Sequence, residues 1–195
     1  NHGLAQNPFK SIVIPRPIGW ISSVDAESVI NLAPYSFFNA VSERPPIVMF
    51  ASGSSRNRDG KKDTLRNIET TKEFVCNIAT WALRDHMNES SAVFDPQIDE
   101  LDIVGLKAVP SEVVSPPRVA ETPIHLECKY IKRVELPFVT DDEKTVVIFG
   151  EVVGIHIRDD LITGTGLVDV DRLDPIGRLG YADYVRINES NIFSM

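Results

Sequence analysis

IHLECKYIKRVEL, residues 124–136, and TVVIFGEVVGIHI, residues 145–157, decide the class of fold that this chain adopts. In both runs apolar residues alternate with polar ones, which is the pattern of a strand with one face against a core. A short polar loop containing Asp141, Asp142 and Glu143 separates the two runs. We therefore expect one long antiparallel pair of strands.

Shorter apolar runs are typical of further strands. The expected strands are Gly19–Val24, Val29–Ala33, Ile47–Ala51, Glu73–Ala79 and Leu106–Val109. Two short helices are expected, one over Thr64–Thr71 capped by Asp63 and one over Leu83–Ser90. The acidic stretch Asp95–Asp102 is expected to be irregular, with a turn at Asp95–Pro96. This balance predicts a mainly β fold, a closed or nearly closed β-barrel with short helices. Without a repeat or a linker, the simplest organisation is a single domain over residues 1–195.

Prolines mark where regular pairing is expected to stop. Pro15 and Pro17 confine the first strand to Gly19–Val24, because proline cannot donate a hydrogen bond to a strand ladder. The stretch NLAPYSFFNAVSERPP, residues 31–46, is rich in aromatic and small polar residues. We expect an irregular aromatic loop, held rigid by Pro34, Pro45 and Pro46.

The composition limits the classes of partner. The 195 residues are 43% hydrophobic and 25% charged, which is an ordinary globular balance, and the formal net charge is −8. An acidic surface argues against a nucleic-acid partner, which requires a basic face. It is compatible with a small, local cationic site.

No part of the sequence indicates a membrane span or a secretion signal. We therefore expect a cytoplasmic protein, with a few further residues before Asn1 because the sequence does not begin with Met. Cys76 and Cys128 lie far apart in apolar runs. We expect two buried thiols rather than a disulfide or a metal site.

The familiar catalytic motifs are missing from the sequence. No G-x-G-x-x-G follows a strand, no G-x-S-x-G elbow occurs, and GTGLVD at 164–169 is expected to be a loop. The histidines show no ligand spacing and are expected to be structural or exposed: His2, His86, His125 and His156. Neither a dinucleotide fold nor a hydrolytic triad is indicated.

Polar and cationic residues gather in the first third of the chain. They are Ser22, Ser23, Ser36, Asn39, Ser52, Arg56, Arg58, Lys61 and Lys62. The helix expected from Asp63–Thr64 follows directly, and a helix N-terminus presents unpaired N–H groups and a positive dipole end. With hydroxyls and cations beside it, this helix start predicts a phosphate site. The alternative is a solvated basic loop.

The aromatic loop at 31–46 supports the ligand interpretation. A planar ligand needs an apolar wall, and irregular backbone offers N–H and C=O groups to the ligand's polar edges. The loop would then line a pocket for a phosphorylated, planar cofactor. The alternative is that Tyr35, Phe37 and Phe38 only fill the end of the barrel.

Four motifs occur in order along almost the whole chain: PRPIGWISS at 15–23, NLAPYSFFNAVSERPP at 31–46, KKDTLRNIETTKEFVCNIA at 61–79 and RLGYADYVRI at 178–187. Together they resemble the flavin reductase-like, FMN-binding split-barrel family. The resemblance is to the branch of flavoredoxin and the reductase component of nitrilotriacetate-type monooxygenases. It implies a Greek-key-like split barrel, a homodimer, and FMN bound near the dimer interface.

The resemblance also implies roles for individual residues. The isoalloxazine ring would be flanked, largely by backbone, by Trp20, Ser22, Ser23, Ser36, Phe37, Phe38 and Asn39. The phosphate and ribityl chain would be held by Ser52, Arg58, Lys62, Asp63 and Thr64. Asp63 would cap the helix or bond a ribityl hydroxyl, since it cannot attract a phosphate by charge. Arg178, Tyr181 and Tyr184 would close over the site, with a partner subunit as one source of these residues.

Three functions remain open at the level of sequence. The first is an oxidoreductase in which NADH or NADPH reduces FMN, which passes the electrons to free flavin, a partner monooxygenase or another acceptor. Such an enzyme needs no catalytic side chain. The second is an FMN-binding electron carrier or flavin store without NAD(P)H turnover. The third is a dimeric β-barrel binding module without flavin.

Overall fold

A computed structural model describes residues 2–54, 60–95, 97–138, 140 and 144–195. The two long runs form the predicted antiparallel pair, β9 (Ile124–Glu135) and β10 (Thr145–Ile157). The register between them shifts after Phe149 and again after Val152. Such bulges bend a strand and increase its twist, which a curved sheet requires.

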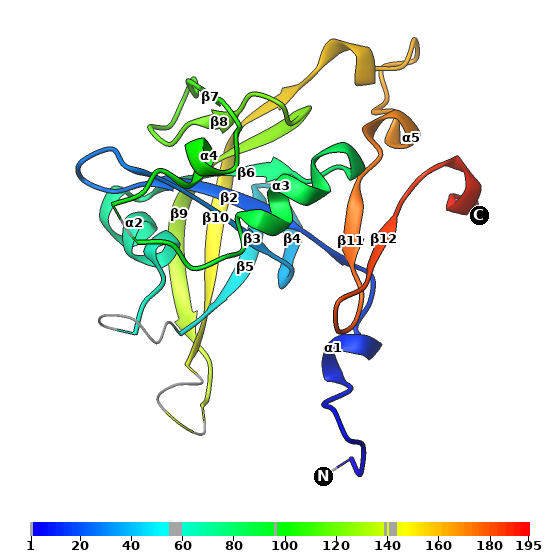
Figure 1. The fold of residues 1–195 in the computed structure, drawn as a ribbon. Coiled ribbons are helices and arrows are strands. Elements are labelled where there is room, and N and C mark those ends of the chain that lie inside the picture. The colour runs from blue at the N-terminus through cyan, green and yellow to red at the C-terminus, as the bar shows by residue number, and fades with distance from the viewer. Residues whose placement is uncertain (1, 55–59, 96, 139, 141–143) are drawn as a thin grey trace.

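β9 and β10 lie within a seven-stranded sheet of order β3-β2-β6-β9-β10-β5-β4, in which every neighbouring pair is antiparallel. The other strands are β2 (Gly19–Val24), β3 (Ile30–Tyr35), β4 (Phe38–Glu43), β5 (Pro46–Gly53) and β6 (Glu73–Ile78). Figure 1 shows these strands wrapped around one another. All the strands predicted for this sheet are present, and β5 is longer than expected.

The sheet closes because its two edge strands are neighbours in the chain. β3 and β4 lie at opposite ends of the strand order, yet only Ser36 and Phe37 separate them. Three residue steps span about 10 Å at most, so the two edges must come together. The amide of Ala51 on β5 also donates to the carbonyl of Phe37, at 2.8 Å. The predicted barrel is therefore confirmed.

The expectation of an irregular loop at 31–46 is wrong, because most of this stretch is strand. β3 continues through Pro34, which lies opposite Trp20 of β2. Since β3 is an edge strand of this sheet, Pro34 can lie in it without breaking a ladder on a second side. Pro46 is likewise tolerated as the first residue of β5.

A small three-stranded sheet stands beside the barrel, and the N-terminal segment extends from it (Figure 1). Its order is β1 (Arg16–Pro17), β11 (Ile176–Arg178) and β12 (Tyr184–Arg186). Pro17 lies opposite Gly177, so regular pairing begins earlier than predicted. Again the proline is on an edge strand. β7 (Ala108–Val109) and β8 (Arg118–Val119) form a separate short hairpin.

Short helices connect and cover the strands. They are α1 (Phe9–Ile12), α2 (Asp63–Thr71), η1 (Trp81–Leu83), α3 (Arg84–Glu89), α4 (Glu100–Ile103), η3 (Asp159–Leu161), α5 (Val170–Leu173) and η4 (Glu189–Asn191). The two predicted helices correspond to α2 and to η1 with α3. No helix of the described residues has the length and apolar character that a membrane span requires.

Two local predictions near these helices are wrong. Lys62, not Asp63, is the N-cap of α2; Asp63 is the first helical residue and pairs with Arg66. The acidic stretch 95–102 was expected to be irregular, but Asp99 caps α4 by accepting the amides of Leu101 and Asp102. The expected turn at Asp95–Pro96 lies partly outside the described residues.

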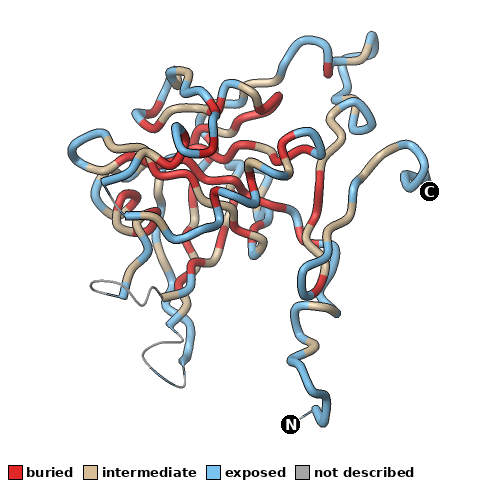
Figure 2. The backbone as a smooth tube through the Cα atoms, in the orientation of Figure 1, coloured by how far each residue is buried: buried red, intermediate tan, exposed pale blue. Residues whose placement is uncertain are grey.

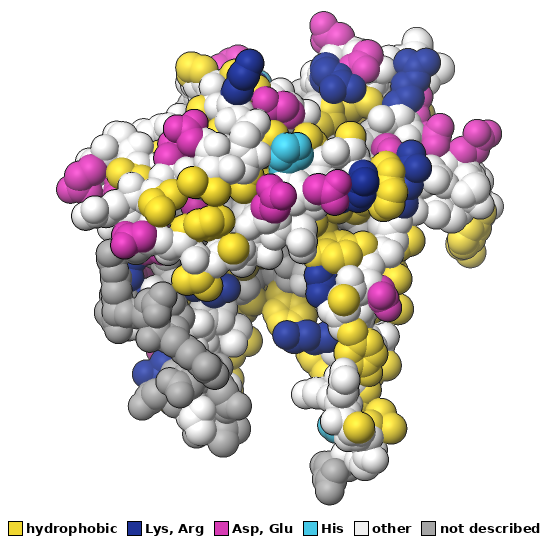
Figure 3. Space-filling view, viewed as in Figure 1, with side chains coloured by type: hydrophobic (Ala, Val, Ile, Leu, Met, Phe, Trp, Pro, Cys, Tyr) yellow, Lys and Arg dark blue, Asp and Glu magenta, His cyan; other side chains and the backbone are white. Residues whose placement is uncertain are grey.

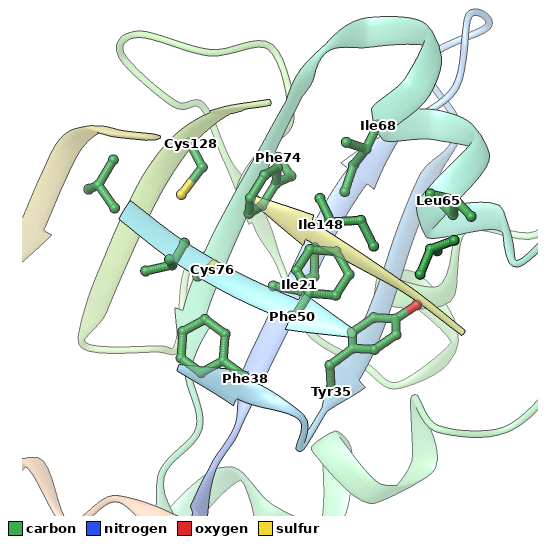
Figure 4. Packing of buried hydrophobic residues seen from close by; sticks show 13 residues of the cluster. Ile21, Tyr35, Phe38, Phe50, Leu65, Ile68, Phe74, Cys76, Cys128 and Ile148 are labelled. Atoms are coloured by element: carbon green, nitrogen blue, oxygen red, sulfur yellow. The ribbon is translucent and has the colours of Figure 1, made fainter. Parts of the chain in front are cut away.

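Buried residues gather along the strands of the barrel (Figure 2), and aromatic and aliphatic side chains of the inward faces build its core (Figure 4). The Phe50 ring lies 4.7 Å from the Tyr35 ring and 5.6 Å from the Phe74 ring, measured between centroids. Cys76 and Cys128 are free, buried members of this cluster, as predicted.

A second buried cluster lies on the other face of β2 and β3, because successive strand residues point to opposite faces. Ile21 therefore belongs to the barrel cluster, whereas Trp20 and Leu32 pack against residues from α3 and α4. The indole N–H of Trp20 donates to Ser90 Oγ at 2.9 Å.

Candidate functional site

Two adjoining cavities meet at the end of β3, and Pro34, Tyr35 and Ser91 line both. The first, called here the helix cavity, has a volume of about 640 Å³ and includes the start of α2. Its lining residues are Asn31, Ala33, Pro34, Tyr35, Lys61, Lys62, Asp63, Thr64, Arg66, Ser90, Ser91, Ala92, Val93, Phe94, Asp95 and Glu100.

The second, called here the arm cavity, has a volume of about 590 Å³ and lies between the barrel and the N-terminal segment. Its lining residues are Asn7, Lys10, Arg16, Ile18, Pro34, Tyr35, Ser36, Phe37, Ala51, Met87, Asn88, Ser91, Arg178, Tyr181 and Tyr184. Each volume is in the range of small-ligand sites, and the two together form one elongated site.

The helix cavity holds the predicted anion-binding groups of α2. The first amides of a helix have no partner within it, so they are available to a ligand. Lys62 has its ammonium 5.6 Å from the Tyr35 ring centroid. Desolvation lowers the pKa of this ammonium, although the residue as a whole remains exposed. Lys61 instead pairs with Glu69 at 2.6 Å. Arg56 and Arg58 lie outside the described residues.

A buried polar network supports the wall of the helix cavity. Thr64 Oγ1 donates to Asn31 Oδ1, while Asn31 Nδ2 and the amide of Leu32 donate to Glu100 Oε2 at 2.6 and 2.5 Å. Burial raises the pKa of Glu100 to about 7, against the opposing effect of these donors. The charge of Asp63 raises it further. A carboxyl group that titrates near neutral pH therefore lies at the predicted phosphate site.

Tyr35 lies where the two cavities meet, and its phenol is an unused hydrogen-bonding group. The residue is 6% exposed, and its hydroxyl has no hydrogen-bond partner among the described residues. Burial raises the pKa of Tyr35 to about 12. The hydroxyls of Thr64 and Ser52 oppose this rise, but neither forms a hydrogen bond of acceptable geometry with the phenol. A buried group of this kind is a ready donor to a ligand.

The arm cavity has aromatic and cationic walls. Phe37, in the link between β3 and β4, is 37% exposed, with the Arg16 guanidinium carbon 5.6 Å and the Lys10 ammonium 6.0 Å from its ring centroid. From β11, Arg178 donates to the Tyr184 hydroxyl and to the carbonyl of Tyr181. Its guanidinium carbon lies 4.4 Å from the Tyr184 ring centroid.

The structure brings together eight of the predicted site residues. Lys62, Asp63 and Thr64 line the helix cavity, and Ser36, Phe37, Arg178, Tyr181 and Tyr184 line the arm cavity. Ser52 is buried beside Tyr35, and Asn39 is exposed on β4, where its side chain accepts from the Ala40 amide. Arg58 lies outside the described residues.

Besides Ser52 and Asn39, four further predicted residues line neither cavity: Trp20, Ser22, Ser23 and Phe38. All are buried. Ser22 donates to the carbonyl of Pro117 at 2.6 Å, and Phe38 packs against Gly19. The strand from Gly19 to Ser22 is paired on both sides, so its backbone groups already serve β3 and β6. They are therefore not free to read a ligand edge.

Several cavity residues escaped the sequence analysis. Tyr35 lies in the 31–46 stretch that was expected to line a pocket, but it was given no role of its own, and Glu100 was noted only as part of the acidic stretch 95–102. Arg16 lies inside the PRPIGWISS motif at 15–23, where an arginine between two prolines was the available signal. Its burial is visible only in the structure. Lys10 and Ser91 gave no signal in the sequence.

Comparison with known proteins places the chain in a family. Residues 11–175 match the family described as "Flavin reductase like domain", and the chain belongs to this family. Membership supports a flavin-related role, as an oxidoreductase or an FMN-binding protein.

An uncharacterized protein of Aquifex aeolicus is 38% identical over 175 residues, covering 90% of this chain and 86% of that protein. Nitrilotriacetate monooxygenase component B from Bacillus cereus is 31% identical in sequence to this chain. Its crystal structure superimposes with a TM-score of 0.87 over 100% of both chains. Flavoredoxin of Desulfovibrio vulgaris (Miyazaki F) shares the fold at 21% identity, with a TM-score of 0.81 over 100% of this chain and 96% of its own. The resemblance to this branch is thus confirmed.

Proposed function

We propose that this protein is an FMN-dependent oxidoreductase in which NADH or NADPH reduces the flavin, and the flavin passes the electrons to free flavin or to a partner protein. The observation that carries the proposal is the elongated site around Tyr35. One end offers a helix N-terminus with Lys62, and the other offers an exposed aromatic ring and open space.

The residues present fit FMN. The α2 amides and Lys62 would bind the phosphate, and the unpartnered Tyr35 phenol would donate to a phosphate or ribityl oxygen. Phe37 and Ser36 would border the ring. Bound FMN supplies the two-electron chemistry, and the protein supplies position, electrostatics and exclusion of water.

The proposal extends to the assembly and the setting. We propose that the chain acts as a cytoplasmic homodimer and delivers reducing equivalents to a monooxygenase or another acceptor. Support for a monooxygenase partner comes from the name of the Bacillus cereus protein, which is a component of such a system. Exposed apolar residues of the N-terminal segment support the dimer: Leu4, Phe9, Ile12, Val13 and Ile14.

An absorbance spectrum tests the proposal directly. The protein is mixed with FMN, desalted and recorded, and then recorded again after anaerobic addition of NADH or NADPH. We expect a retained flavin band that bleaches with at least one nucleotide. Retention without bleaching would instead indicate an electron carrier. Absence of FMN binding in a titration would indicate a barrel without flavin.

A further inference from the structure

The arm cavity contains a concentration of positive charge that the FMN phosphate does not explain. Lys10, Arg16 and Arg178 line it, and no Asp or Glu of the described residues does. The helix cavity, by contrast, includes Asp63, Asp95 and Glu100. Figure 3 shows Lys and Arg side chains at the hollow between the barrel and the N-terminal segment. In a chain with a net charge of −8, such a site is selective for anions.

Arg16 is a buried cation without a counter-charge. It is 6% exposed, and no carboxylate of the described residues lies within ion-pairing distance of it. Its terminal nitrogens donate to the carbonyls of Lys10 (2.5 Å), Val13 (2.7 Å) and Leu179 (2.8 Å). Its Nε has no hydrogen-bond partner in the part of the chain that the structure describes. Buried charges in proteins are normally paired, so this arginine lacks an anion.

Arg178 adds a second positive charge that no carboxylate of the described residues compensates. Among the described residues, it donates hydrogen bonds to the hydroxyl of Tyr184 and the carbonyl of Tyr181, which are neutral. Desolvation, and then repulsion from Arg178, lower the pKa of Arg16. Two like charges on neighbouring strands, β1 and β11, thus face one cavity without compensation from the described residues. An oxyanion between them would relieve both the desolvation and the repulsion.

The aromatic wall of the arm cavity indicates that the ligand also has a planar group. The partly exposed Phe37 ring lies beside the cationic groups, where it can stack on a planar molecule. We propose that Arg16 and Arg178, with Lys10, form a subsite that binds the phosphate or carboxylate group of the planar molecule that exchanges electrons with the flavin. This inference rests on the proposed function, and it assigns a second anion site separate from that of the FMN phosphate.

Calorimetric titration of the FMN-loaded protein with inorganic pyrophosphate and with benzoate tests the subsite. We expect at least one anion to bind, with an affinity that falls as salt is added. Arg178→Gln should weaken binding about tenfold to a hundredfold, the effect of one charge-assisted contact. Lys10→Gln leaves the Arg178 hydrogen bonds in place and should weaken anion binding less than Arg178→Gln does. This second variant keeps the test valid if Arg178→Gln fails to fold.

Arg158→Gln is the matched control, because it removes the same charge from an exposed arginine that pairs with Asp160. It should bind the anions as the wild type does. Failure of both anions to bind, or equal affinity in the Arg178→Gln and Arg158→Gln variants, would overturn the subsite. So would loss of FMN with riboflavin spared in Arg178→Gln, because the cavity would then hold the cofactor's own phosphate. Flavin absorbance reports separately whether the proposed function fails.

Steady-state kinetics identify the source of the anion. If a pyridine nucleotide phosphate occupies the subsite, Arg178→Gln raises KM for NADH and leaves KM for the uncharged 1-benzyl-1,4-dihydronicotinamide unchanged. If a carboxylate acceptor occupies it, KM for NADH is unchanged while benzoate binding is lost. An equal rise in KM for both donors, with anion binding intact, would contradict the proposal.

Discussion

Glu100 shows how burial of a single residue makes the stability of the protein depend on pH. Its pKa is raised from 4.5 to about 7, chiefly by desolvation. Between these two values the folded state binds more protons than the unfolded state, so the free energy of unfolding falls as pH rises. At about 1.4 kcal/mol per pKa unit, the fall amounts to roughly 3 kcal/mol.

The first prediction follows from that linkage. Glu100→Gln keeps an acceptor for Asn31 and Leu32 but cannot ionise, so its stability should not fall between pH 4.5 and 7. Denaturant unfolding at several pH values measures the difference from the wild type. Glu89→Gln, on the exposed face of α3, should retain the wild-type profile. A wild-type profile in Glu100→Gln would show that another group is responsible.

The second prediction separates the two ends of the proposed flavin site. Lys62→Ala should weaken FMN binding by about one to two decades, the worth of a charge-assisted bond, and spare riboflavin, which lacks the phosphate. Phe37→Ala should weaken both ligands alike. Fluorescence titration with each flavin makes the comparison, and Lys107→Ala serves as a control for loss of charge at an exposed site. Equal loss of both flavins in Lys62→Ala would contradict the phosphate assignment.

At the scale of elements, β10 depends on a glycine at its bulge. A Cβ on Gly150 would lie 2.3 Å from Cζ of Phe74 and 3.3 Å from Cβ of Cys128. Phe74 is fully buried against Phe50, so its ring has little room to move. The glycine therefore allows β10 to pass closely over the aromatic core.

The third prediction is that Gly150→Ala lowers the free energy of unfolding by roughly 1–3 kcal/mol, because the added methyl group overpacks the core. Gly53→Ala on β5 is the matched control, since a Cβ there meets no atom of the described residues within 4 Å. Denaturant unfolding measures both variants. Similar stabilities for the two variants would mean that the ring of Phe74 can move away from the added methyl group at little energetic cost.

The elements also show the limits of local rules. Proline was expected to exclude Pro17 and Pro34 from strands, but a sequence does not reveal which strands are edges. Both residues lie on edge strands, where one side needs no amide. Asp99 is a residue type that favours helix N-caps, but α4 is only one turn long and lies in an acidic run. Such a run gives no periodic pattern from which a helix could be predicted.

At the scale of the whole molecule, the N-terminal segment leaves apolar side chains in solvent. Ile12 is 71% exposed and Phe9 is 56% exposed. We propose that these groups lie in the interface of the homodimer that the family resemblance implies.

The fourth prediction is that light scattering gives twice the mass of one chain. Ile12→Asp should shift the protein toward monomer, because it places a charge in the interface. Leu167→Asp, an equally exposed apolar position in the 164–169 loop, should leave the mass unchanged. A wild-type protein with the mass of one chain would contradict the dimer.

The alternating strands, the β9–β10 pair, α2 and the family were all predictable from the sequence, because these depend on local periodicity and on ordered motifs. The folded structure was needed to show that β3 and β4 join opposite edges of one sheet, which puts Tyr35 and Phe37 at the meeting point of two cavities. It also brought Arg16 from the N-terminal part of the chain to Arg178 from the C-terminal part. The physical reason is that a strand pattern specifies which face is buried, whereas long-range pairing specifies which side chains meet.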